Sequence, residues 1–150
     1  MCLKRKYRKS VFILIYSLNE GKISYLVLKR KLHWRGWEFP KAGVEKRESN
    51  IKAVIREINE ETGLNPLKIK RHRKKGYWNY ESSLKDRPGL IGQSWRLYSV
   101  LVNQTKVKID KKEHSDFKWV DYKEAIRLLT HENQRECLVY FHNWLIKKIN

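Results

Sequence analysis

Apolar and polar positions along the chain alternate between strand-like runs and helix-like spacings. Two β-branched runs open the sequence, residues 11–18 and 23–28, and the turn Asn19-Glu20-Gly21 between them predicts a hairpin. An aromatic connector, residues 34–40, ends in a proline, which disfavours helix immediately before it. Ala42-Gly43 then predicts a turn that leads into a helix.

The segment after this turn has helical spacing and local signals for both helix ends. Ser49 or Asn50 can cap its start, because their short polar side chains accept the free backbone N–H groups there. Gly63 can end it, since glycine readily adopts the left-handed conformation of a helix C-cap. Apolar residues at helical spacing form the predicted buried stripe: Ile51, Val54, Ile55 and Ile58.

The remainder of the chain continues the mixture of strands and helices. The predicted strands are residues 67–80, 93–103 and 117–120, with a loop over 82–92, and the predicted helices are 123–129 and 136–148. The resulting order, β-β-α-β-β-β-α-α, predicts the α/β class with a mixed central sheet between helices. The length of 150 residues, without repeats or linkers, predicts a single domain over residues 1–150.

Three carboxylates share one face of the predicted helix. Glu57, Glu60 and Glu61 stand at spacings i, i+3 and i+4, which are neighbours on a helix surface. Like charges held together repel each other, and a bound Mg²⁺ or Mn²⁺ relieves the repulsion because carboxylate oxygens coordinate it. A solvated acidic face is the alternative, but the chain has only 16 Asp and Glu residues. The cluster therefore predicts a divalent metal site and chemistry on phosphate.

The segment around these carboxylates resembles the Nudix box, G-x5-E-x7-R-E-U-x-E-E-x-G-U, in which U is an aliphatic residue. The match covers residues 42–64 and consists of Glu48, Arg56-Glu57, Ile58, Glu60-Glu61 and Gly63-Leu64, with one departure at Ala42. The resemblance implies a Nudix-type α/β/α sandwich that uses a metal-activated water to cleave a phosphoanhydride bond in a nucleoside diphosphate-linked substrate. It also implies that Glu57, Glu60 and Glu61 hold the metal. Arg56 and Glu48 would pair and fix the loop against the helix.

Two further stretches narrow the branch of the family. Glu113-His114-Ser115-Asp116-Phe117-Lys118-Trp119 resembles a stretch shared by diadenosine tetraphosphate hydrolases and bacterial RNA pyrophosphohydrolases. That implies a fourth carboxylate at Glu113, as metal ligand or general base; an ordinary loop glutamate is the alternative. Ile91-Gly92-Gln93-Ser94-Trp95 is similar to a stretch of the RNA pyrophosphohydrolases and makes Gln93 a substrate-binding candidate. Two substrates stay open: 5′-triphosphate or capped RNA ends, and dinucleoside polyphosphates such as diadenosine tetraphosphate.

The net charge adds an argument about partners. It is +18, from 34 Lys and Arg against 16 Asp and Glu, which attracts polyanions but also serves solubility. The basic run over residues 68–75 includes Arg73 and is followed by Tyr77 and Tyr80. Cations beside aromatic rings predict a nucleic-acid surface, with these residues as substrate-binding candidates. The alternative is a lysine-rich edge strand that resists aggregation, with its aromatic residues in the core.

The stretch before the box, Trp37-Glu38-Phe39-Pro40-Lys41, also resembles the family. It adds Trp37 and Lys41 to the substrate-binding candidates. Arg30 or Lys31 is a further candidate for phosphate binding, with ordinary surface charge as the alternative. Isolated histidines are more often structural than catalytic, so none receives a role.

Ala42, together with the basic surface, motivates a second hypothesis from a different class. Alanine adds a methyl group and disfavours the positive φ that the family glycine permits, although Gly43 beside it can supply that freedom. A non-catalytic RNA-binding protein that keeps the Nudix fold is therefore the alternative to the enzyme.

Cysteine usage and the N-terminal apolar run bear on the cellular compartment. Cys2 and Cys137 lie far apart and form no zinc or disulfide pattern. The apolar run at residues 11–16 is too short for a membrane span, and no small-residue cleavage site follows it. We therefore expect a cytoplasmic protein with no membrane partner, whose oligomeric state the sequence leaves open.

Overall fold

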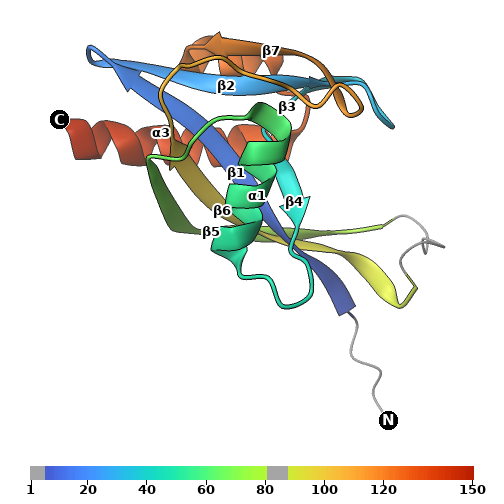
Figure 1. Ribbon diagram of the computed structural model, residues 1–150. Coiled ribbons are helices and arrows are strands. Elements are labelled where there is room, and N and C mark those ends of the chain that lie inside the picture. Colours follow the sequence, from blue (N-terminus) through green and yellow to red (C-terminus); the bar gives the residue numbers. More distant parts are fainter. Residues whose placement is uncertain (1–5, 81–87) are drawn as a thin grey trace.

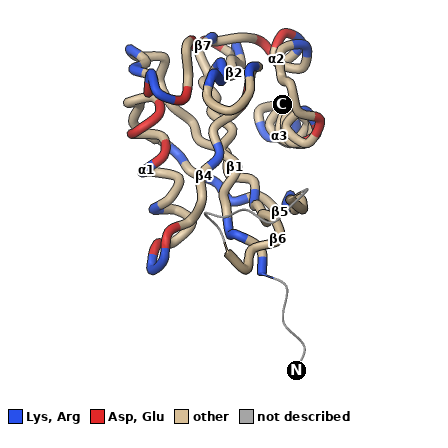
Figure 2. The backbone as a smooth tube through the Cα atoms, turned by 90° about the vertical axis from the view of Figure 1, so that its right-hand side faces the viewer, with Lys and Arg blue, Asp and Glu red and all other residues tan. Residues whose placement is uncertain are grey.

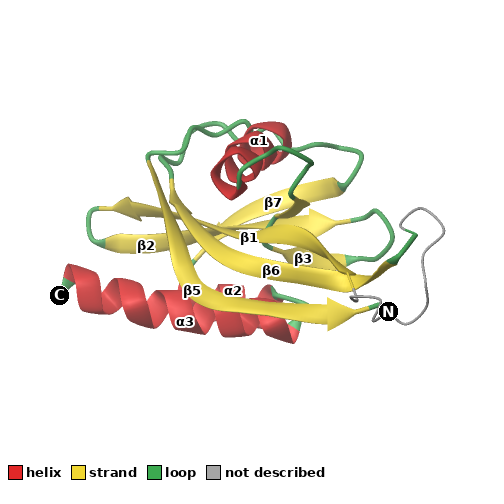
Figure 3. Cartoon of the chain, turned by 90° about the horizontal axis from the view of Figure 1, so that it is seen from below, coloured by secondary structure: helices red, strands yellow, loops and turns green. Residues whose placement is uncertain are grey.

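The computed structural model describes residues 6–80 and 88–150, which form a seven-stranded sheet between helices. The elements are β1 (Lys6–Asn19), β2 (Lys22–Arg30), β3 (Gly36–Glu38), β4 (Lys41–Gly43), α1 (Asn50–Thr62), β5 (Lys68–Asn79), β6 (Leu90–Leu101), β7 (His114–Val120), α2 (Tyr122–Leu128) and α3 (Glu132–Ile149). Figures 1 and 3 show α1 on one face of the sheet and α2 and α3 on the other. The predicted α/β class with a mixed sheet between helices is confirmed.

Strand β1 organises the sheet. Along the main path the order is β3-β2-β1-β6-β5, with β1 and β6 parallel and the other pairs antiparallel. The first half of β1 also pairs with β4, whereas its last residues pair with β2 in the predicted hairpin. β7 pairs with β2. The sheet therefore forks along β1, and α1 lies against β1 and β4 at the fork.

The unbroken apolar run of β1 serves two cores, one on each face of the sheet. Phe12, Leu14 and Tyr16 pack towards α3, and Val11, Ile13 and Ile15 pack towards α1. Successive side chains of a strand point to opposite faces, so a strand buried on both faces is hydrophobic throughout rather than alternating.

Both predicted ends of α1 are confirmed. The Ser49 side chain accepts the Lys52 N–H at 3.2 Å, which satisfies one of the free donors of the first turn. Gly63 adopts a left-handed φ of 69°, and its N–H donates to the carbonyls of Ile58 and Asn59. These local signals fix where the helix starts and stops.

The buried face of α1 differs from the predicted apolar stripe. Val54 and Ile58 are buried as predicted, but Ile51 and Ile55 are 41% and 45% exposed. The buried residues of the helix are Ala53, Val54, Glu57, Ile58, Glu61 and Thr62. The helix is therefore rotated relative to the prediction, so that Glu57 and Glu61 face inward and line the cavity described below.

Several element boundaries also differ from the prediction. Ala42-Gly43 forms part of β4, paired with β1, instead of a turn. β6 begins at Leu90, inside the predicted loop, whose residues 82–87 lie outside the described part of the chain. β7 and α3 begin at His114 and Glu132, earlier than predicted. Pairing with a neighbouring strand places Ala42-Gly43 in β4 and extends β6 and β7, and the local apolar pattern does not carry that information.

The remaining expectations concern the edge of the sheet, the cysteines and the membrane. β5 lies at the edge of the sheet, as the edge-strand alternative for the basic run predicted. Cys137 is buried in the core and Cys2 lies outside the described residues, so the absence of a disulfide and the cytoplasmic location stay predictions. Among the described helices, none has the length and apolar character needed to cross a membrane.

His72 is a buried histidine on β5. It is 2% exposed, its Nε2 lies 2.7 Å from Ser99 Oγ, and its ring is edge-on to Phe141 and Trp144 of α3. Burial, with a smaller contribution from Lys70, lowers the pKa of His72 to about 4. The imidazole is therefore neutral in the folded protein near pH 7.

We expect the free energy of unfolding to fall as pH decreases from 6.5 to 4, because of His72. The unfolded chain binds a proton at this histidine near pH 6.5, whereas the folded chain does so only near pH 4. The contribution of neutral His72 to the free energy of unfolding is therefore fully present above pH 6.5. It decreases by on the order of 3 kcal/mol as the pH falls to 4. His72→Gln, which cannot be protonated, should flatten this part of the profile in chemical denaturation. Parallel profiles for the two proteins would contradict the expectation.

Candidate active site

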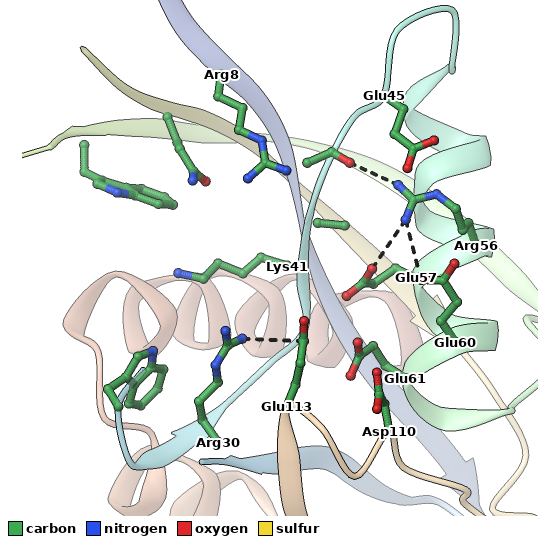
Figure 4. A pocket seen from close by; sticks show the side chains of 15 residues that line it. Arg8, Arg30, Lys41, Glu45, Arg56, Glu57, Glu60, Glu61, Asp110 and Glu113 are labelled. Atoms are coloured by element: carbon green, nitrogen blue, oxygen red, sulfur yellow. Dashed lines mark hydrogen bonds and ion pairs between the residues drawn. The ribbon is translucent and has the colours of Figure 1, made fainter. Parts of the chain in front are cut away.

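A cavity of about 440 Å³ beside α1 has opposite charges on its two sides. Its acidic residues are Glu45, Glu57, Glu60, Glu61, Asp110 and Glu113, and its basic residues are Arg8, Arg30, Lys41 and Arg56. Figure 4 shows most of the carboxylates on the α1 side, facing Arg8, Arg30 and Lys41. Trp34, Trp78 and Gln93 also line the cavity, as do Ala42 and Gly43. Most of these residues come from strands β1, β2, β4, β5 and β6, from α1 and from the loop before β7, which the fork in the sheet brings to one place.

The three carboxylates of α1 line this cavity together. Glu57 and Glu61 are only 8% and 4% exposed, whereas the Glu60 side chain is 55% exposed. Burial, followed by the neighbouring charges of Glu61 and Glu113, raises the pKa of Glu57 to about 8. The chain therefore keeps carboxylates close together at an electrostatic cost that a bound cation would remove.

Glu113 reaches the same cavity from the loop before β7. Its carbonyl accepts the N–H groups of Lys31 and Leu32 at 2.9 and 3.3 Å, which ties the loop to the end of β2. Burial, followed by Glu61, raises the pKa of Glu113, and its carboxylate lies 3.7 Å from Arg30 Nη1. The structure therefore brings Glu113 to the helix carboxylates, where the resemblance to the family had suggested it would act.

His114 connects this cluster to a buried carboxylate on β3. Its Nδ1 lies 2.9 Å from Glu61 Oε2, and its Nε2 lies 2.8 Å from Glu38 Oε2. Burial alone would lower the pKa of His114, but the hydrogen bonds to Glu38 and Glu61 raise it to about 9. A protonated imidazole donates from both nitrogens, so it holds Glu61 in place. Arg30 Nη1 also contacts Glu38 Oε2, at 3.2 Å.

Neither His114 nor Glu38 was given a role from the sequence. Only the position of His114 could have suggested a role. It directly follows Glu113, and a histidine at the start of a strand can face inward. Its partners depend on the pairing of β7 with β2 and of β2 with β3, which a single sequence does not reveal.

Arg56 and Glu48 form the pair that the resemblance implied. Arg56 Nε and Nη2 lie 2.9 and 3.0 Å from the two carboxylate oxygens of Glu48, a two-pronged contact. Arg56 Nη2 also donates to the Gly43 carbonyl at 3.1 Å, and Glu48 accepts the Glu45 N–H. The hydrogen bond from Arg56 lowers the pKa of Glu48 to about 2. Glu48 does not line the cavity; it fastens the loop between β4 and α1.

The basic side of the cavity depends on a close backbone approach at Gly43. A side chain there would place its Cβ about 2.2 Å from Arg8 Nη2, so glycine leaves the room that the guanidinium occupies. Lys41 Nζ lies 4.6 Å from the centre of the Trp78 ring. Burial, together with Arg30 and against the effect of Glu38, lowers the pKa of Lys41.

The other predicted substrate-binding residues separate into two groups. Lys41 and Gln93 line the cavity. The four others are not among its lining residues: Trp37, Arg73, Tyr77 and Tyr80. The aromatic rings that line it are Trp34 and Trp78, and Trp78 lies on β5 directly after the exposed Tyr77. Strand alternation separates those two rings, and the facing direction of β5 was not available from the sequence.

The donor set of the cavity fits a hard divalent cation. Glu61, Glu113 and His114 each offer a ligand-type atom, and these atoms lie within 4.8 Å of one another. Both nitrogens of His114 already contact carboxylates, which leaves carboxylate oxygens as the available donors. Oxygen donors of this kind suit Mg²⁺ or Mn²⁺. Burial, followed by the charges of Glu61 and Glu113, raises the pKa of Glu57, and a nearby cation would oppose that effect.

The chain is similar to known proteins over most of its length. The model of the NUDIX domain family matches residues 6–141. An RNA pyrophosphohydrolase of Hydrogenovibrio crunogenus is 32% identical over 127 residues, which cover 77% of this chain and 74% of that protein. Another RNA pyrophosphohydrolase, from Ruthia magnifica subsp. Calyptogena magnifica, is 31% identical over 127 residues, covering 77% and 69%.

Solved structures share the fold over nearly the whole chain. A binary complex of the C. elegans Ap4A (diadenosine tetraphosphate) hydrolase aligns with a TM-score of 0.76 and 22% identity, covering 93% of this chain and 98% of that one. The E. coli dihydroneopterin triphosphate pyrophosphohydrolase aligns with a TM-score of 0.72 and 20% identity, covering 91% and 97%. These likenesses support the fold, and the family match, which spans most of the described residues, shows that the chain belongs to the NUDIX domain family.

Proposed function

We propose that this chain, as a single domain over residues 1–150, hydrolyses a phosphoanhydride bond in a nucleoside 5′-polyphosphate, foremost the 5′-triphosphate end of RNA. The observation that carries the proposal is one cavity with clustered carboxylates on one side and Arg8, Arg30 and Lys41 on the other. The prediction of a Nudix pyrophosphohydrolase is confirmed at the level of enzyme class by the family and the relatives. The particular substrate is our proposal, supported by the names of those relatives.

The carboxylates would hold the metal. Glu57, Glu60, Glu61 and Glu113 are the donors that we assign to Mg²⁺ or Mn²⁺. When bound, such an ion neutralises phosphate charge and lowers the pKa of a coordinated water. Glu113, which faces Glu61 across the cluster, either completes this donor set or accepts the proton of the attacking water.

The opposite side would bind and orient the substrate. Arg8, Arg30 and Lys41 are placed to contact phosphate oxygens, since they face the carboxylates across the cavity. Trp34 and Trp78 offer faces on which a base can stack, and the volume of about 440 Å³ is within the range of small-molecule sites. Arg56 and Glu48 would keep the loop and helix in register, so that both sides stay in position.

A dinucleoside polyphosphate is the second candidate substrate. Two tryptophans line the cavity, which suits a ligand with two bases, and the C. elegans Ap4A hydrolase shares the fold. Both candidates contain the same phosphoanhydride bond, so the carboxylates alone do not discriminate between them.

Ala42 does not favour the non-catalytic alternative. Ala42 lies in β4, pairs with Val11 of β1, and is a 7% exposed residue of the core beside α1. Within residues 6–80 and 88–150, the non-glycine residues with positive φ are Glu20, His33 and Arg47, so the backbone at Ala42 does not need the freedom of glycine. The close approach occurs at Gly43, which the chain retains.

The proposal is tested by turnover of three substrates with Mg²⁺: 5′-triphosphate RNA, diadenosine tetraphosphate and a nucleoside triphosphate. We expect hydrolysis of at least one of them, detected as phosphate or pyrophosphate from a triphosphate end and as two nucleotides from diadenosine tetraphosphate. Glu60→Gln should lose at least about 100-fold in activity, because the variant removes one charged metal donor from an exposed side chain. Glu136→Gln, an exposed glutamate on α3, is the matched control and should keep full activity.

Two results would contradict this assignment. No turnover of any of the three substrates by the unmodified protein would reject the enzyme. Full activity of Glu60→Gln, with an unchanged fold by circular dichroism, would reject the role of this helix face in binding metal.

A pair of substitutions tests whether His114 positions Glu61. The amide nitrogen of asparagine reaches the Nδ1 position and can still donate to Glu61, whereas that of glutamine reaches the Nε2 position and serves Glu38. We expect His114→Gln to weaken Mn²⁺ binding and turnover by roughly 10–100-fold, and His114→Asn to lose less. The Mn²⁺ dissociation constant, measured calorimetrically, separates this role from structural support. Equal losses in both variants would indicate structural support alone.

We expect Ala42→Gly to restore the family residue without raising activity. The substitution removes a buried methyl group and adds backbone freedom to the unfolded chain, so unfolding should become easier by about 1–2 kcal/mol. Denaturant titration and turnover, measured together, check this. A gain in turnover of tenfold or more would show that the alanine limits catalysis.

A further inference from the structure

One end of the three-stranded region β1-β6-β5 presents cations and aromatic rings on the face that α1 covers elsewhere. Lys9 pairs with Ser94 and Ser94 with Tyr77, while Arg96 pairs with Val11 and Lys75. Directly paired residues share a face of a sheet, and Val11 faces α1. The members of this cationic face are Tyr7, Lys9, Arg71, Lys75, Tyr77 and Arg96.

This cationic face is not covered by α1. In Figure 1 the ends of β1 and β6 extend past α1, and Figure 2 shows the acidic positions gathered along α1 rather than on these strands. Lys9, Arg71 and Lys75 are exposed, and the Tyr77 residue is 67% exposed. The face is therefore accessible in the described part of the structure.

A second cavity, of about 230 Å³, lies within the cationic face. Its charged lining residues are Lys9, Arg71, Lys75 and Arg96, with no Asp or Glu among the described residues that line it. Arg96 Nη1 donates to the His72 carbonyl at 3.2 Å, so the backbone of β5 holds this guanidinium in place. Asn50, the first residue of α1, also lines it, and the first turn of α1 has no acidic residue to reduce the positive end of the helix dipole.

Aromatic rings accompany these charges. The rings of Tyr7 and Tyr77 lie edge to face with centres 5.4 Å apart, and the Tyr7 hydroxyl donates to Asn79 Oδ1 at 2.7 Å. Exposed aromatic rings on a sheet are suited to stack nucleic-acid bases, and neighbouring cations to hold the phosphates between those bases.

Protection of a sheet edge does not account for this arrangement. Lysines on the edge strand β5 would serve that purpose, but Arg96 lies on the interior strand β6, and Lys9 lies on β1, beyond β6 from that edge. Cations from three adjacent strands converge on one cavity, whereas protection of an edge requires them on one strand only.

The cationic face and the catalytic cavity use opposite faces of the same strands. Arg8, Trp78 and Gln93 line the catalytic cavity and are the sequence neighbours of Lys9, Tyr77 and Ser94. We propose that the cationic face binds single-stranded RNA, contacting the nucleotides that follow a 5′ end held in the catalytic cavity. This inference rests on the proposed function, and it assigns Tyr77 a place in binding the polymer outside the catalytic cavity.

The test measures binding of single-stranded RNA with a 5′-hydroxyl, which has no polyphosphate for the catalytic cavity. The double variant Lys9→Glu/Lys75→Glu should bind at least tenfold more weakly by fluorescence anisotropy. It should also reduce the slope of log affinity against log salt by roughly 0.7 for each lost phosphate contact. Lys123→Glu/Lys147→Glu, on α2 and α3, changes the net charge equally and should bind as the unmodified protein does. Tyr77→Ala should weaken binding about tenfold through lost stacking.

Kinetics separate this inference from the proposed function. The double variant on the cationic face should raise KM for 5′-triphosphate RNA and leave turnover of diadenosine tetraphosphate unchanged. Equal RNA binding by the two double variants, or an equal loss of turnover on both substrates, would overturn the inference while the enzyme assignment stands. If the unmodified protein hydrolyses neither substrate, the proposed function fails, and the anisotropy comparison still decides whether this face binds RNA.

Discussion

Repulsion between buried carboxylates is the constraint around which this structure is arranged. Glu57 and Glu61 are almost fully buried beside Glu113, and burial together with their mutual charge raises the pKa of Glu57 to about 8. The chain offsets part of this charge with Arg56, 3.8 Å from Glu57, and with His114, bonded to Glu61. Arg56 itself lines the cavity, and Arg30 lies 3.7 Å from the Glu113 carboxylate, so these cations balance only part of the six acidic residues in the described lining. Clustered carboxylate oxygens of this kind are the donors that a hard divalent cation prefers, which is why we propose a metal there.

The fork in the sheet is what brings these groups together. Because the two halves of β1 pair with β4 and β2 respectively, α1 beside β4 and the loop before β7 arrive at one place. The register of β7 on β2 pairs His114 with Arg30, so Glu113 and Arg30 lie side by side at the cavity. The carboxylates of the helix are neighbours in sequence, but their partners are joined to them only by strand pairing.

This division also explains which features could be predicted. The ends of α1 and the three helix carboxylates follow from local rules, so Ser49, Gly63 and the spacing of the glutamates were sufficient. The predicted rotation of α1 was wrong. The apolar pattern places Ile55 on the buried face, whereas in the structure Glu57 and Glu61 are buried and Ile55 is exposed. Glu38 and His114 were missed because their contact depends on two strand registers. Tyr77 and Trp78 differ only in which face of β5 they occupy, which no local signal determines.

The cavity beside α1 is locally acidic, although the chain as a whole is strongly basic. The chain carries +18, yet the cavity beside α1 has six acidic residues and four basic ones among its described lining. Long-range attraction therefore draws a polyanion to the protein, while the cavity itself repels phosphate on the α1 side. A divalent cation on the carboxylates reverses that local sign and makes the whole cavity attractive to phosphate. In the proposed function, the overall positive charge would attract the polyanionic substrate, and the carboxylates of α1 would bind the metal.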